Sequence, residues 1–114
     1  MSDLQLRQAT SDDLNALLQL EHRCFSEDRL SRRSFRRFLD MPRDRLIVAE
    51  AKSEGKSELL GYCLVLMSAA TRMARIYSIA VLPTARGRGI GEKLVKTAER
   101  EAADAGRILL RLEV

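Results

Sequence analysis

The sequence predicts an α/β fold with a mixed (α+β) sheet, in the order β-α-α-β-β-β-α-β. Two patterns carry this prediction. Segments with apolar residues at helical spacing are interspersed with short apolar segments typical of strands, and polar turns that contain glycine or proline separate them. The chain has 114 residues, of which 46% are apolar, enough for the core of one domain. We therefore expect a single domain over residues 1–114.

The N-terminal segment predicts a strand followed by a helix. Leu4–Arg7 alternates apolar and polar residues, as a half-buried strand does. Thr10 can cap the helix that follows, and Asp12 and Asp13 then fall in its first turn, where the helix dipole favours negative charge.

A second helix is predicted to begin at Ser31. Leu30 just before this cap and Phe35 within the helix have the spacing of a hydrophobic staple. Pro42 ends the helix, because its ring excludes it from a helix interior.

Three strands are expected next, at Arg45–Ala51, Glu58–Ala69 and Ala74–Leu82. The first two are joined by Lys52–Lys56, which is polar and contains glycine and so predicts a hairpin. The second strand has apolar residues on both faces, which indicates a central position in the sheet.

The C-terminal segment predicts a loop at Pro83–Arg88, a helix at Gly89–Ala105 and a strand at Ile108–Val114, with Gly106 as the left-handed cap of the helix. A strand, helix and strand in close succession indicate a parallel pair with a right-handed crossover. The last strand has no turn or polar tail after it. We therefore expect a fold that is truncated after its fifth strand, with an unpaired edge through which two copies could form a homo-oligomer.

The composition excludes several classes of site. With one histidine and two separated cysteines, the sequence argues against a structural zinc site and against a serine-histidine triad. Cys24 and Cys63 are expected to be free thiols in the core, with a single disulfide between them as the alternative. No signal peptide and no apolar segment of membrane-spanning length is found, which favours a cytoplasmic protein with no membrane partner.

The charge points to an anionic partner. The net charge of +4 and the pI of about 9.5 favour a phosphorylated cofactor, an acidic peptide or nucleic acid. Aromatic residues make up only 4% and show no stacking pattern, which disfavours nucleic-acid binding as the main function. Seven arginines lie between residues 29 and 45, and we interpret them first as a solvated helix face, with an acidic acceptor or a ribosomal surface as the alternative.

A glycine-rich loop between a strand and a helix is the most informative motif. Gly87, Gly89 and Gly91 let the backbone approach a ligand closely, and the first amides of the helix can bind phosphate oxygens. Arg86 and Arg88 add positive charge at the same place. The loop is thus predicted to hold a phosphate group.

Two well-known phosphate loops do not fit this motif. A P-loop requires Gly-Lys followed by Ser or Thr, whereas Gly91 is followed by Glu92. A dinucleotide-binding fingerprint fits at Gly87 and Gly89, but its third glycine would fall at position 92, where Glu92 stands.

A third pattern fits in full. Arg86-x-x-Gly89-x-Gly91 resembles the Arg/Gln-x-x-Gly-x-Gly/Ala signature of the GNAT superfamily of acetyltransferases, and the order of elements is that of the first two thirds of that fold. The segments Ser78–Val81 and Leu112–Val114 are most similar to those of the ribosomal-protein-alanine N-acetyltransferases.

The resemblance implies acetyl-CoA as co-substrate and no metal. It implies that backbone groups of Ile79, Ala80 and Val81 bind the acetyl-pantetheine arm, with the Val81 amide facing the thioester oxygen, and that Glu113 accepts a proton. The pyrophosphate would be held by Arg86, Gly87, Arg88, Gly89, Ile90 and Gly91. The family also uses a later asparagine and tyrosine, which have no counterpart up to Val114.

The implied reaction is direct transfer of an acetyl group from acetyl-CoA to a primary amine. The expected acceptor is the N-terminal α-amine of a protein or peptide, for which a ribosomal protein is a candidate. Two alternatives stay open at this point: a non-catalytic module that binds CoA, and a basic domain associated with the ribosome or RNA.

Overall fold

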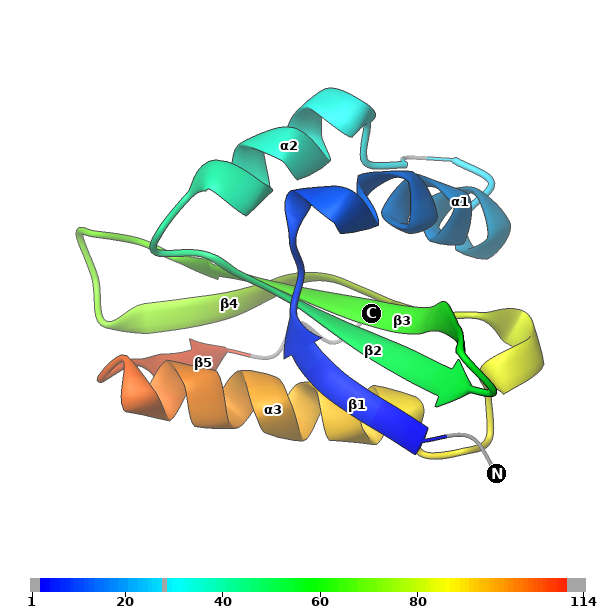
Figure 1. Ribbon diagram of the computed structural model, residues 1–114. Coiled ribbons are helices and arrows are strands. Elements are labelled where there is room, and N and C mark those ends of the chain that lie inside the picture. Colours follow the sequence, from blue (N-terminus) through cyan, green and yellow to red (C-terminus); the bar gives the residue numbers. More distant parts are fainter. Residues whose placement is uncertain (1–2, 28, 111–114) are drawn as a thin grey trace.

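A five-stranded sheet lies between two helical layers in the computed structural model, which describes residues 3–27 and 29–110 (Figure 1). The element order is the predicted one. The elements are β1 (Asp3–Gln8), α1 (Leu14–Cys24), α2 (Arg32–Asp40), β2 (Arg45–Ser53), β3 (Lys56–Met67), β4 (Met73–Val81), α3 (Ile90–Asp104) and β5 (Ile108–Leu110).

The strands follow one another in space in the order β1-β2-β3-β4-β5. All neighbouring pairs are antiparallel except β4 and β5, which are parallel, so the mixed α/β sheet, the central β3 and the parallel last pair are confirmed. Among the described residues, β5 pairs with β4 only from Met73 to Arg75. The second half of β4 therefore has β3 on one edge and no described strand on the other.

The helices divide between the two faces of the sheet. Helices α1 and α2 cover one face and α3 covers the other (Figure 1). Each face buries large apolar side chains, among them Leu17 and Phe35 under the first pair and Leu94 under α3, all fully buried. In the described part of the chain, no helix has both the length and the apolar character needed to cross a membrane.

The helix caps follow the predicted residues, with one difference at the first helix. Ser31 Oγ accepts a hydrogen bond from the Ser34 amide at 3.1 Å, as expected of an N-cap. The turn at Ser11–Asp13, which was expected to be α-helical, is instead a separate 3₁₀ turn. The Asp13 carboxylate accepts the Thr10 amide at 2.7 Å and so tightens this turn ahead of α1.

Arg7 joins this turn to the sheet. Its guanidinium donates to Asp13 Oδ2 at 2.8 Å and to Glu50 Oε2 at 3.1 Å, and both carboxylates belong to buried residues. The hydrogen bonds from Arg7 lower the pKa of Asp13 and that of Glu50 below their ordinary values of 3.8 and 4.5, although burial acts in the opposite direction. Both carboxylates are therefore charged at neutral pH.

This cluster predicts how stability depends on pH. Because both folded-state pKa values are lowered, the stabilisation is present above the ordinary values and is lost as the pH falls through the lowered ones. We expect Arg7→Met to lower the free energy of unfolding at neutral pH by about 1–3 kcal/mol, since two buried charges lose their donor. Urea denaturation from about pH 6 to about pH 3 should also show a flatter acid dependence in Arg7→Met than in the natural protein.

The matched control is Arg33→Met, which removes an exposed arginine of α2. It should leave both the stability at neutral pH and the acid dependence unchanged. An equally steep acid dependence in Arg7→Met would mean that Arg7 does not set these pKa values.

Candidate functional site

Alternate backbone groups at the end of β4 face away from β3. The Leu82 amide donates to the Leu60 carbonyl at 2.8 Å, so residue 82 points its polar groups toward β3. Successive residues of a strand direct their amides and carbonyls to opposite edges. The amides of Val81 and, two residues earlier, Ile79 are therefore directed to the other edge, where no described strand pairs with them.

A β-bulge at Tyr77 contributes to this arrangement. Ser78 pairs with Leu64, but the next residue of β3, Val65, pairs with Ile76, so Tyr77 is an extra residue in β4. A bulge bends its strand and changes the direction of the residues beside it. No local sequence pattern signals this bulge.

The glycine-rich loop forms a tight turn at the start of α3. Gly87 and Gly89 have φ angles of 85° and 74°, in the left-handed region that residues with a Cβ rarely adopt. The Lys93 amide donates to the Gly89 carbonyl at 3.1 Å, which is the first hydrogen bond of the helix. The amides of Ile90 and Gly91 precede it and have no acceptor one turn earlier within the helix.

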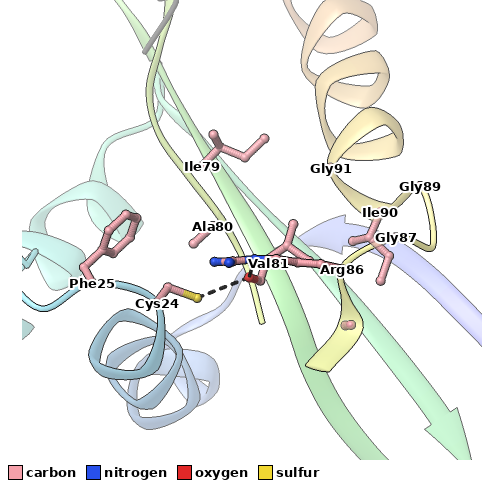
Figure 2. Close-up of a pocket in the computed structure, with 11 residues that line it drawn as sticks. Cys24, Phe25, Ile79, Ala80, Val81, Arg86, Gly87, Gly89, Ile90 and Gly91 are labelled. Atoms are coloured by element: carbon pink, nitrogen blue, oxygen red, sulfur yellow. Dashed lines mark hydrogen bonds between the residues drawn. The ribbon is translucent and has the colours of Figure 1, made fainter. Parts of the chain in front are cut away.

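A pocket of about 450 Å³ lies between the end of β4 and this turn. Figure 2 shows β4 along one side, the glycine turn and the start of α3 on the second, and the end of α1 on the third. The lining residues are Cys24, Phe25, Ile79, Ala80, Val81, Ala85, Arg86, Gly87, Gly89, Ile90 and Gly91.

Two side chains converge on one carbonyl in the pocket. Cys24 Sγ lies 3.4 Å and Arg86 Nε lies 3.2 Å from the Val81 carbonyl oxygen, and both donate to it (Figure 2). Burial raises the pKa of the Cys24 thiol, with Arg86 acting in the opposite direction, so the thiol is protonated at neutral pH. These contacts fix the Arg86 guanidinium beside the strand.

The structure brings together most of the residues singled out in the sequence. Arg88 belongs to the turn but does not line the pocket, and Glu113 lies outside the described residues. Sequence reasoning missed Phe25 and Ala85 and misplaced Cys24, which was expected in the core and is instead partly exposed in the pocket wall. Their place depends on how α1 packs on β4, and no local pattern in the sequence signals that contact.

A buried polar network fixes two walls of the pocket, α1 and β4, relative to each other. The Tyr62 hydroxyl donates to Glu21 Oε1 at 2.6 Å and lies 2.7 Å from Ser78 Oγ, while the Leu30 amide donates to Glu21 Oε2 at 2.6 Å. Burial raises the pKa of Tyr62, so its hydroxyl stays neutral. The network links α1, the connection to α2, β3 and β4, and it holds Ser78 directly before the pocket residue Ile79.

The pocket has two chemically different ends. The β4 end offers apolar side chains and outward-facing amides, which suits an elongated chain with polar groups along it. The other end offers a helix N-terminus and Arg86, which together favour an anion. Among the described residues, no group of three or more histidine, cysteine, aspartate or glutamate side chains is placed to hold a metal ion.

Comparison with protein families gives a match over most of the chain. The model of the acetyltransferase (GNAT) family matches residues 14–114. A comparison with curated proteins gave no match.

Several solved structures share the fold. The chain is 18% identical to the ribosomal-protein-S18-alanine N-acetyltransferase from Escherichia coli, with a TM-score of 0.78 over 96% of this chain and 66% of that enzyme. It is 16% identical to an aminoglycoside N-acetyltransferase in complex with CoA, with a TM-score of 0.78 over 100% of this chain and 79% of that one. It is 25% identical to an acetyltransferase from Vibrio fischeri, with a TM-score of 0.72 over 94% and 93% of the two chains.

Proposed function

Because the chain belongs to the acetyltransferase (GNAT) family, we propose that it transfers an acetyl group from acetyl-CoA to the N-terminal α-amine of a protein or peptide. The observation that carries the proposal is the pocket that joins the outward-facing amides of β4 to the glycine turn of α3. The arm of an elongated thioester would fit the β4 end of the pocket, and its diphosphate would fit the end at the glycine turn.

In this proposal, the pantetheine arm runs along Ile79–Val81 and the pyrophosphate lies against the amides of residues 87–91. The backbone amides of the strand bond the arm where a neighbouring strand would otherwise pair. Arg86 and the N-terminus of α3 offset the phosphate charge. Arg88, which follows in the same turn, contributes positive charge from outside the pocket.

The proposed reaction needs one proton acceptor and one proton donor. The amine nitrogen attacks the thioester carbonyl, a C–N bond forms, the C–S bond breaks, and the amine proton leaves while the thiolate takes one up. The Val81 amide would stabilise the negative charge that develops on the thioester oxygen. By its resemblance to the family, Glu113 is proposed as the acceptor of the amine proton.

The protonation of amines favours an α-amine as acceptor. An α-amine has a pKa of about 7.7–8.0, against about 10.4 for the lysine side chain. At pH 7, roughly a tenth of α-amines are neutral, compared with about one lysine in a few thousand. One carboxylate acting directly or through water would therefore be enough.

The test uses the full-length protein in two steps. Isothermal titration with acetyl-CoA should give saturable binding, and release of free thiol should follow when a peptide with a free N-terminus is added. The matched control peptide has a blocked N-terminus and one lysine, and it should release thiol at least about tenfold more slowly because its amine is protonated.

Two results would contradict the proposal. Absence of acetyl-CoA binding would contradict the proposed cofactor site, and equal rates with the two peptides would contradict the preference for an α-amine.

Glu113→Gln should lower the rate of thiol release at least about tenfold without changing acetyl-CoA affinity. Equal rates in Glu113→Gln and the natural protein would remove Glu113 from catalysis.

A further inference from the structure

A second cavity lies on the α1–α2 side of the sheet, away from the glycine turn. It has a volume of about 590 Å³ and lies where the end of α2 meets the end of β3 and the start of β4. We call it the arginine groove, because three arginines from two parts of the chain surround an apolar floor. Its lining includes Arg37, Arg43, Arg75, Phe38, Met41 and Leu66.

Two of these arginines are held by aromatic rings. Arg37 Cζ lies 5.3 Å from the centroid of the Phe38 ring, and Arg75 Cζ lies 5.9 Å from that of Tyr77. The two rings are themselves in contact, with centroids 6.1 Å apart. Stacking of this kind orients a guanidinium and leaves its N–H groups available for an anion.

The groove carries an excess of positive charge. Within the described residues, no carboxylate forms an ion pair with any of its three arginines. The one acidic residue in its lining is Asp44, whose Oδ1 accepts the Met67 amide at 3.0 Å. Three arginines against one aspartate make the groove complementary to an acidic ligand.

Other arginines of the same segment have different roles. Arg29 donates to the Phe25 carbonyl, Arg32 to Asn15 Oδ1 at 2.9 Å, and Arg45 to the Pro42 carbonyl at 2.9 Å. They stabilise the chain itself. The arginine-rich segment is therefore more than a solvated helix face, since Arg37 and Arg43 join Arg75 of a distant strand around one cavity.

The groove lies along the same strand as the proposed cofactor pocket. Arg75 lines the groove and Ile79 lines the pocket, and the exposed Tyr77 lies between them in β4. Arg75 and Val81, whose amide is proposed to face the thioester oxygen, are six residues apart, and six residues of extended strand span about 20 Å. A peptide whose amine reaches the thioester beside Val81 could thus reach the groove with a side chain about six residues further on.

We propose that the arginine groove binds acidic side chains of the acceptor, about six residues after its N-terminal amine. This inference rests on the proposed function and names the class of its substrate. The guanidinium groups of Arg37, Arg43 and Arg75 would form bidentate hydrogen bonds with the carboxylates. Met41 and Leu66 would contact the apolar parts of the peptide.

The test measures peptide binding, so it does not depend on turnover. Two C-terminally labelled peptides with free N-termini differ only at about positions six to eight, which are acidic in one and the corresponding amides in the other. Fluorescence anisotropy with CoA-saturated full-length protein should give at least about tenfold tighter binding of the acidic peptide, equivalent to about 1.4 kcal/mol. The double variant Arg37→Gln/Arg75→Gln should lose most of this preference, because only Arg43 remains of the three arginines.

The matched control is Arg33→Gln/Arg36→Gln, which removes the same charge from exposed positions of α2 outside the groove. It should keep most of the preference for the acidic peptide. Equal binding of the two peptides by the natural protein, or an equal loss in both double variants, would overturn the inference. So would a single-stranded RNA that binds the natural protein more tightly than the acidic peptide does.

Failure of this inference can be distinguished from failure of the proposed function. CoA affinity, measured by isothermal titration, should be unchanged in both double variants because none of these residues lines the cofactor pocket. CoA binding and thiol release without a preference for the acidic peptide would overturn only the inference about the arginine groove. Absence of CoA binding would overturn the function, whereas the anisotropy comparison, repeated without CoA, would still decide whether the groove binds acidic peptides.

Discussion

Gly91→Glu is expected to weaken acetyl-CoA binding at least about a hundredfold while leaving the fold intact. A Cβ at Gly91 would meet only Val81 Cγ2 at 3.8 Å, an ordinary contact, so the structure accommodates a side chain there. An acidic residue in the first turn is also favourable for the helix. In the proposed complex, however, the carboxylate would stand against the diphosphate. Isothermal titration and thermal unfolding measure the two effects separately.

Two further substitutions at this position separate charge from size. Gly91→Gln has the bulk of glutamate without its charge and should lose clearly less affinity. Gly91→Ala should bind within about threefold of the natural protein, since the signature that the sequence resembles accepts glycine or alanine here. If Gly91→Glu bound acetyl-CoA as tightly as Gly91→Ala, the diphosphate would not lie at the start of α3.

Gly89→Ala is expected to lower acetyl-CoA affinity at least about tenfold by distorting the turn. Gly89 has a φ of 74° with open space around it, so alanine there is strained by its backbone conformation and not by a collision. The strain costs about 1–2 kcal/mol and can be relieved if the turn opens. Opening would redirect the amides that are proposed to hold the diphosphate.

The chain offers a closely matched control for this strain. Gly55, in the turn between β2 and β3, has a φ of 77° and also has open space around it. Gly55→Ala should lower the thermal stability by a similar amount and leave acetyl-CoA affinity unchanged. A similar loss of affinity in both variants would assign the effect to general destabilisation rather than to the turn.

Local sequence patterns predicted the features that depend only on residues close together in the chain. The Ser31 cap, the Gly106 terminus with its φ of 72°, and the pair between Glu92 and Lys96, with Nζ and Oε1 3.3 Å apart, all depend on neighbours within one turn. The glycine turn was found for the same reason, because its conformation is encoded by Gly87 and Gly89 themselves. Such features need no knowledge of the rest of the fold.

Features that depend on tertiary packing could not be predicted in this way. The bulge at Tyr77 arises from the pairing of β4 with β3, and the pocket wall at Cys24 arises from the packing of α1 against β4. The arginine groove joins α2 to the start of β4, about thirty residues apart in sequence. In each case the interacting residues are distant along the chain, and neither partner alone signals the contact.

We propose that the amides of the glycine turn bind the diphosphate of CoA while the end of β4 binds its pantetheine arm. The most direct measurement is heteronuclear NMR of isotope-labelled full-length protein, titrated with CoA and separately with pantetheine, which lacks the diphosphate. We predict that CoA shifts the amide signals of Gly87, Gly89 and Gly91 together with those of Ile79 and Val81, and that pantetheine shifts only the latter two. Saturation with CoA that leaves the signals of the three glycine amides unchanged would show that the diphosphate does not lie at the glycine turn.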